Sequence, residues 1–238
     1  MKISEADLLL EIDKDSFRQN LRRFTWQAYN LLPTIERPEI LDLGCGTGVP
    51  TIELAILSKG HILAVDRDRQ ALARLKQKAA ALGLQKHIRA AAADLTRYRP
   101  KREAYDIIWA EGLVSAVGFE KALTLWRDGL KPDGHLVIHD EIKHHEQNLA
   151  AAGRLGWEVV THFIVPVDAW LTEYFRPLSG RLHDLAARYA RDHEALEVLK
   201  REEAEIEVFK TNPDDFASAF YILKKGMFKE PERVMPAK

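Results

Sequence analysis

The chain has little of several features that would identify its class at once. Of its 238 residues one is cysteine, Cys45, and three are methionine. A single cysteine excludes a disulfide within one chain and favours a reducing compartment. No apolar run approaches the ~20 residues of a membrane-spanning helix, and the first residues lack the charged and then apolar layout of a signal peptide. We therefore expect a soluble, cytoplasmic protein that has no membrane partner.

An excess of either charge is also absent. The 35 basic and 36 acidic residues leave a formal net charge of −1, which argues against a general nucleic-acid binder, since such proteins carry a basic excess or stripe. The short basic stretch 97–102 is interpreted as a solvated loop. Neither a His-Glu-x-x-His motif nor a cysteine pair is present. The polar turn 139–145 is therefore expected to face a substrate, and no metal site is predicted.

A glycine loop is the most informative feature that is present. The apolar stretch Ile40–Leu43 runs into glycines at three alternate positions, so backbone N–H groups can approach a ligand where a helix begins. A dinucleotide fold would place its third glycine one residue later, in Gly-x-Gly-x-x-Gly. We expect a cofactor with an amino-acid end and no pyrophosphate, which S-adenosylmethionine would satisfy. The predicted cofactor residues here are Asp42, Gly44, Cys45, Gly46 and Gly48, with Cys45 chosen for its small size rather than as a nucleophile.

Two further carboxylates end predicted strands. The second apolar strand, 62–65, ends in Asp66, 22 positions after Gly44 (66 − 44), where an acidic residue accepts hydrogen bonds from ribose hydroxyls. The alternative role, N-cap of the next helix, is assigned to Asp68. A third strand within 88–95 ends in Asp94, which is predicted to reach the adenine amine. Arg67 and Leu95, adjacent to these carboxylates, are included among the cofactor-binding residues.

Strands and helices alternate from Ile40 onward. A further apolar strand is predicted at 105–112, and the stretch 130–138 is interpreted as a helix end, a Pro-Asp-Gly turn and a fifth strand. Such alternation favours parallel strands joined by helical crossovers, and hence an α/β fold with a Rossmann-like sheet.

At this point the chain resembles the class I S-adenosylmethionine-dependent methyltransferases, in the branch with a ubiquinone/menaquinone-biosynthesis-like domain. The matching motifs are Leu-Asp-Leu-Gly-Cys-Gly-Thr-Gly at 41–48, Val-Asp at 65–66, Ala-Asp-Leu at 93–95, Trp-Ala-Glu-Gly at 109–112 and Leu-Lys-Pro-Asp-Gly at 130–134. The resemblance covers about 37–139. It implies a seven-stranded, mostly parallel sheet with helices on both faces and an antiparallel last strand. Trp170, Tyr174, Phe175 and the charged helix that follows resemble an uncharacterised bacterial subgroup.

We expect a single methyltransferase domain, 1–238. It divides into an N-terminal helical lead (1–36), a cofactor-binding core (37–165), a helical insert (166–213) and a last strand (214–226). The apolar stripe of the insert is interpreted as ordinary core packing. Whether the insert covers the pocket or forms a homodimer contact is left open.

The acceptor side is predicted from position. Glu111 follows the fourth strand and is predicted to contact the cofactor's amino-acid end or the acceptor. It would serve as a base if the acceptor is a hydroxyl or amine, and the alternative is a surface or helix-capping carboxylate. Ala110 is predicted to contact the cofactor, and His139, Trp170 and Tyr174 the substrate. Because an Asn-Pro-Pro-Tyr motif is absent, the resemblance implies in-line methyl transfer to a small-molecule acceptor. The alternatives are a catalytically silent S-adenosylmethionine-binding sensor or partner subunit and an NAD-dependent oxidoreductase.

Overall fold

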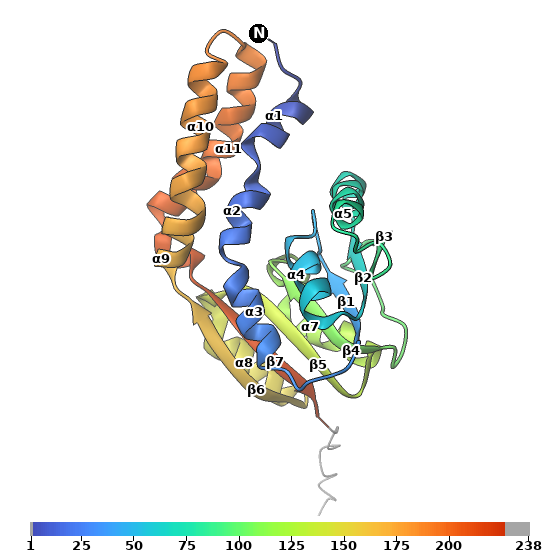
Figure 1. Ribbon diagram of the computed structural model, residues 1–238. Coiled ribbons are helices and arrows are strands. Elements are labelled where there is room, and N and C mark those ends of the chain that lie inside the picture. The colour runs from blue at the N-terminus through green and yellow to red at the C-terminus, as the bar shows by residue number, and fades with distance from the viewer. Residues whose placement is uncertain (1, 227–238) are drawn as a thin grey trace, which may run out of the picture.

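A computed structural model describes residues 2–226, so Met1 and residues 227–238 of the expected domain lie outside the described part. One seven-stranded sheet runs through the molecule (Figure 1). Its strands are β1 (Glu39–Leu43), β2 (His61–Asp66), β3 (Ile88–Ala92), β4 (Tyr105–Glu111), β5 (Leu130–Glu141), β6 (Trp157–Val165) and β7 (Ser218–Lys225). Their order is β3-β2-β1-β4-β5-β7-β6, and only β7 runs antiparallel to its neighbours. The predicted fold class is thereby confirmed.

The central strands are apolar because both faces of the sheet are covered. Ile40, Leu41 and Leu43 of β1 are fully buried, as are Ile108 and Trp109 of the adjacent β4. Parallel strands covered on both faces require such continuous apolar runs. This requirement explains why the sequence patterns of β1 and β4 could be recognised.

Helices pack on both faces of the sheet. One face carries α3 (Arg22–Asn30), α4 (Val49–Ser58) and α5 (Arg69–Ala81), whose buried side chains belong to one hydrophobic cluster. The other carries α6 (Val114–Val117), α7 (Phe119–Trp126) and α8 (His145–Arg154), which bury a second cluster. The N-cap of α5 is Asp68, whose carboxylate accepts from the N–H groups of Gln70 and Ala71. The predicted N-cap is therefore confirmed.

The first two helices of the lead and the helices of the insert lie together beyond one end of the sheet and form one helical layer (Figure 1). The lead contains α1 (Glu5–Ile12) and α2 (Lys14–Asn20) as well as α3; the insert contains α9 (Val167–Trp170), a π-helical turn (Leu171–Phe175), α10 (Arg176–Arg188) and α11 (His193–Thr211). The apolar stripe of α10, including Leu178, Leu182 and Leu185, is buried in the larger cluster. This stripe packs as core, as the sequence indicates.

Polar contacts tie the lead to the insert. Lys14 Nζ lies 2.6 Å from Glu202 and 2.8 Å from Glu205, and the N–H of Ile3 donates to Asp192. In the described part of the chain, no helix is both long and apolar enough to cross a membrane.

Candidate active site

The glycine loop leaves β1 at the carboxyl edge of the sheet. The N–H of Gly44 donates to the carbonyl of Val65 at 2.8 Å, and the N–H of Gly48 donates to the carbonyl of Cys45 at 2.8 Å. Gly44, Gly46 and Gly48 have φ values of +74°, +51° and +87°. These values lie in the left-handed region that side chains disfavour, so the loop needs glycine at each position.

The three glycines face different surroundings. A Cβ at Gly48 would lie 2.2 Å from the Leu75 side chain, and one at Gly44 would lie 2.9 Å from Leu113. At Gly46, by contrast, no atom of the described chain lies within 4 Å of such a Cβ. Gly44 and Gly48 are therefore required by packing, whereas Gly46 faces open space.

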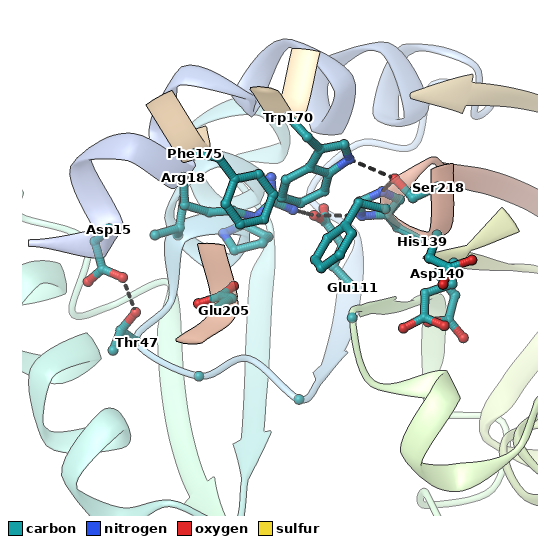
Figure 2. A pocket seen from close by; sticks show the side chains of 18 of the residues that line it. Asp15, Arg18, Thr47, Glu111, His139, Asp140, Trp170, Phe175, Glu205 and Ser218 are labelled. Carbon is teal, nitrogen blue, oxygen red and sulfur yellow. Dashed lines mark hydrogen bonds and ion pairs between the residues drawn. The ribbon is translucent and has the colours of Figure 1, made fainter. Parts of the chain in front are cut away.

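That space belongs to a cavity of about 620 Å³ between the loop and the helical layer (Figure 2). Its floor is formed by the loop, together with Val49 and Pro50 of α4. The other walls come from the lead, from the ends of β4 and β5, from the insert and from the start of β7, and include Asp15, Arg18, Glu111, Gly112, His139, Asp140, Trp170, Phe175, Glu205, Val208, Phe216 and Ser218. The volume lies within the ordinary range for small-molecule sites.

Two predicted cofactor carboxylates lie behind the loop rather than in the cavity wall. Asp42 is buried and accepts a 2.5 Å hydrogen bond from Thr51 of α4, and burial raises the pKa of Asp42 to about 7. Asp66 accepts from the N–H of Gly46 at 2.8 Å and from the N–H of Asp68 at 2.9 Å. Asp42 therefore stabilises the start of α4, and Asp66 stabilises the loop.

The other predicted cofactor residues are divided between cavity, surface and core. Cys45 lines the cavity, and burial raises the pKa of its thiol, which keeps it in the unreactive protonated form. Arg67 and Asp94 are exposed, and Asp94 accepts from the hydroxyl and N–H of its neighbour Thr96. Leu95 and Ala110 pack in the second hydrophobic cluster, so their side chains are core residues.

Glu111 is held by polar partners from several elements. Its carboxylate accepts from Arg18 at 2.6 Å, from Thr25 at 3.0 Å and from the indole N–H of Trp109 at 2.8 Å. Burial alone would raise the pKa of Glu111, but His139 and the Arg18 charge outweigh it and hold this pKa at about 2.

The expectation that Glu111 acts as a base stays a prediction. A general base works best with a pKa near the working pH, and the pKa of Glu111 is lowered while its carboxylate accepts from three donors. Glu111 lines the cavity, as expected for a residue that contacts a ligand.

The imidazole ring of His139 lies beside the Glu111 carboxylate. Its Nδ1 is 3.7 Å from Glu111 Oε2, and its Nε2 is 2.8 Å from the Ser218 hydroxyl oxygen. The ring stacks on Phe220, with centroids 4.2 Å apart, and on Trp170, with centroids 6.2 Å apart. The predicted substrate residues His139 and Trp170 are thus brought together at the cavity wall (Figure 2).

The π-helical turn decides which aromatic rings reach the cavity. A π-helix closes with i→i+5 hydrogen bonds, which brings a residue and the fifth after it to one side, whereas an α-helix turns them apart. Trp170 and Phe175 both line the cavity. Phe175 is 2% exposed and Tyr174 is 7% exposed, and both belong to the core cluster, where the Tyr174 ring packs against the other two rings. Phe175 nevertheless lines the cavity beside Trp170, whereas Tyr174 does not.

Sequence reasoning missed Arg18, Asp15 and Ser218. Arg18 pairs with Glu111 and lies over the Trp170 ring, 5.3 Å from its centroid, while Asp15 accepts from the hydroxyl of Thr47 at 2.6 Å. Arg18 and Asp15 both belong to α2. The sequence showed the apolar spacing of this helix, but it did not show which residues its polar face contacts. Within residues 2–226, no group of three or more histidine, cysteine, aspartate or glutamate side chains is arranged to hold a metal ion.

Known proteins share the fold and part of the sequence. Residues 40–134 match the family model of a methyltransferase domain. An uncharacterized protein of Haemophilus influenzae is 32% identical over 105 residues, which are 43% of this chain and 42% of that one. Ribosomal RNA small subunit methyltransferase G of Deinococcus deserti is 34% identical over 137 residues, 54% of this chain and 55% of the relative. The chain thus spans about half the length of the curated relatives it matches.

A solved structure matches nearly the whole fold. The S-adenosylmethionine-dependent methyltransferase from Thiobacillus denitrificans, in complex with S-adenosyl-L-homocysteine, has a TM-score of 0.74 at 19% identity, covering 94% of this chain and 99% of that one. At this identity the likeness establishes the fold. Residues 40–134 match a methyltransferase domain, and the chain has a fold found in S-adenosylmethionine-dependent methyltransferases, which is consistent with a class I S-adenosylmethionine-dependent methyltransferase.

Proposed function

We propose that this protein transfers a methyl group from S-adenosylmethionine to a small-molecule acceptor. The observation that carries the proposal is the cavity at Gly46. A glycine with left-handed φ faces open space there, and that space continues to a wall of aromatic and polar side chains. The loop therefore has room for a ligand in this cavity.

The residues fit the cofactor along the carboxyl edge of the sheet. In this proposal its amino-acid end lies against Gly44–Gly46, its ribose at Asp66 and its adenine near Asp94, with Arg67 beside them. The free lone pairs of the Asp66 carboxylate, already directed to the loop through Gly46, would accept from the ribose hydroxyls. When bound, the sulfonium supplies a methyl group that is already activated for transfer.

The protein's own contribution is to align the acceptor and exclude water. Proximity and orientation can lower a barrier by about 7–11 kcal/mol. Trp170, Phe175 and Phe216 give the acceptor an apolar wall, and the Arg18–Glu111 pair joins the lead to the core beside it. The helical layer thus forms the wall of the site that faces the loop.

A small acceptor is favoured over RNA, although the names of two relatives concern ribosomal RNA. The family match ends at residue 134, before the insert that supplies Trp170 and Phe175, so it concerns the cofactor core. The near-neutral chain also lacks a basic excess for binding a phosphate backbone.

Methyl transfer can be tested with S-adenosylmethionine labelled in the methyl group. The purified protein is incubated with a bacterial metabolite extract in one reaction and with total ribosomal RNA in another. We expect label in the small-molecule fraction and none in the RNA. Label in the RNA alone would indicate that the acceptor is RNA and not a small molecule. Binding of S-adenosylmethionine without any methyl transfer would favour the sensor alternative.

Asp66→Ala should weaken binding of S-adenosyl-L-homocysteine. Each lost hydrogen bond to the charged carboxylate is expected to cost about 1.5–3 kcal/mol, and the loop also loses the support at Gly46. Calorimetry measures the change, and Asp68→Ala is the control. That variant should lose its N-cap, about 1 kcal/mol of stability, and bind normally. Unchanged affinity in a folded Asp66→Ala protein would remove Asp66 from the site.

A further inference from the structure

Three side chains from three adjacent strands meet at one part of the cavity wall. Glu111 ends β4 and is the register partner of His139 on β5. Ser218 begins β7, which lies on the other side of β5. His139 lies between the other two: its Nδ1 is 3.7 Å from Glu111 Oε2, and its Nε2 is 2.8 Å from Ser218 Oγ. All three residues line the cavity.

Stacking against two aromatic rings fixes the orientation of the His139 ring, and so the direction in which its two nitrogens point. One face of the imidazole lies nearly parallel to Phe220, with an angle of 4°, and the ring is also within 8° of parallel to Trp170. Rotation is further limited because His139 is only 4% exposed. The nitrogen edge therefore lies between Glu111 and Ser218, on the side where both meet the cavity (Figure 2).

The hydrogen bonds allow the proton on this ring to lie on Nδ1, and the proposal takes that tautomer. The indole N–H of Trp170 can only donate, so Ser218 Oγ accepts from it at 3.1 Å. The hydroxyl hydrogen of Ser218 is then free to point at His139 Nε2. In that arrangement Nδ1 carries the ring proton, and it faces the Glu111 carboxylate. Nδ1 has no partner at hydrogen-bond distance within the described chain, so the ring is polarised by Glu111 without being locked to it.

We propose that Glu111, His139 and Ser218 form a proton relay that serves a protic acceptor, namely an apolar molecule carrying a hydroxyl or an amine. The inference rests on the proposed methyl transfer and names its acceptor class. The triad logic of acid, histidine and hydroxyl applies, with the acceptor donating to Ser218 Oγ. The apolar side of the acceptor would lie against Phe175, Phe216 and Val208, which line the same cavity.

The step balances in atoms and electrons. A lone pair of the acceptor oxygen or nitrogen forms the new bond to the methyl carbon, and the S–CH₃ bond breaks with its electrons left on sulfur, giving S-adenosyl-L-homocysteine. The acceptor's proton passes to Ser218 Oγ as the Ser218 proton passes to His139 Nε2. The resulting imidazolium lies next to the Glu111 carboxylate and later releases its proton to water.

The charges around His139 suit this task. Burial lowers the pKa of His139, opposed by the Glu111 carboxylate, and Arg18 of α2 acts in the same direction as burial. The groups packed from β7 and α9, which are Phe220, Ser218 and Trp170, carry no charge at neutral pH, and Asp140 and Glu141 follow on β5. The imidazole is thus neutral and able to accept a proton at neutral pH.

The tautomer gives a first test that needs no acceptor. Nitrogen-15 NMR of the histidine rings, with His139→Gln to assign the signal, should show His139 neutral at pH 7 with its proton on Nδ1. Glu111→Gln should lower the pKa of His139, because it removes the carboxylate that stabilises the imidazolium. A proton on Nε2 would overturn the relay, whatever the outcome of the transfer assay.

The second test uses the label-transfer assay with the metabolite extract. His139→Gln should reduce transfer by about 100-fold, and Ser218→Ala by about tenfold. The matched control is His135→Gln, since His135 is also buried on β5 with an unpartnered Nδ1 but lies outside the cavity lining; it should retain normal transfer. The rate of the wild type should fall with decreasing pH, and Glu111→Gln should move that fall to lower pH.

Mass spectrometry of the labelled product completes the test. A methyl ether or an N-methylamine supports the relay. A methyl group on carbon or on a thiol sulfur would overturn it, as would undiminished transfer by folded His139→Gln. Absence of any transfer in the wild type would instead count against the proposed function, and the NMR result would still decide the proton positions.

Discussion

Gly46→Val is expected to abolish measurable binding of S-adenosylmethionine, a loss of at least about a hundredfold, or about 2.7 kcal/mol. A side chain at this position would enter the cavity where the loop backbone must meet the ligand. Nothing in the described chain lies within 4 Å of the added Cβ, so this atom meets no part of the protein. The fold should therefore lose only the cost of placing valine at a φ of +51°, about 1–3 kcal/mol.

Gly83 provides the control for that strain. Its φ is +71°, no described atom lies within 4 Å of a Cβ built there, and it follows α5 away from the cavity lining. Gly83→Val should lose similar stability in a thermal melt and bind normally by calorimetry. If Gly46→Val also binds normally, the glycine loop is a structural turn and the cofactor site must lie elsewhere.

Arg18→Met is expected to destabilise the fold by about 3 kcal/mol at pH 7. The side chain of Glu111 is 4% exposed and that of Arg18 is 22% exposed, so removing the arginine leaves a buried carboxylate without its main counter-charge. The exposed pair of Arg201 with Glu5 serves as the control, and Arg201→Met should change stability by less than about 1 kcal/mol. Urea unfolding measures both changes.

The effect of Arg18→Met should depend on pH. In the wild type the folded pKa of Glu111, about 2, lies below its ordinary value of 4.5. The groups that lower this pKa, His139 and Arg18 among them, therefore stabilise the fold above about pH 4.5, and this contribution is lost as the pH falls toward 2. In Arg18→Met, burial without the guanidinium favours the neutral acid, so the stability difference from the wild type should shrink on acidification. A difference that stays constant from pH 7 to 3 would contradict the role assigned to this pair.

Local patterns predicted the sheet and the loop because both are defined by neighbours in sequence. Continuous apolar runs marked β1 and β4, and glycines marked the turn after β1. The same patterns could not show that Asp42 points under the loop to Thr51. An acidic residue at a strand end is compatible with either direction, and the choice is made by packing against α4.

The residues around Glu111 could not be found in this way. Arg18 lies 93 positions from Glu111 in the sequence, and Ser218 lies 79 positions from His139. No spacing rule connects such distant segments. A lone serine before an apolar strand also has no distinctive pattern. The strand order brings it beside His139, since β7 inserts between β5 and β6.

The aromatic residues of the insert show the limit set by helix geometry. Trp170, Tyr174 and Phe175 were recognised together, but α-helical spacing would pair Trp170 with Tyr174. In the structure Trp170 and Phe175 line the cavity and Tyr174 does not, although Tyr174 and Phe175 both belong to the core cluster. The π-helical turn over Leu171–Phe175 is the local departure that α-helical spacing could not predict.

Parallel calorimetric titrations of the purified protein with S-adenosyl-L-homocysteine and with NAD⁺ test the central claim most directly. Saturable binding of S-adenosyl-L-homocysteine, lost in Gly46→Val and retained in Gly83→Val, with no heat from NAD⁺, is the predicted result. Saturable binding of NAD⁺ with none of S-adenosyl-L-homocysteine would contradict the methyltransferase assignment of this cavity.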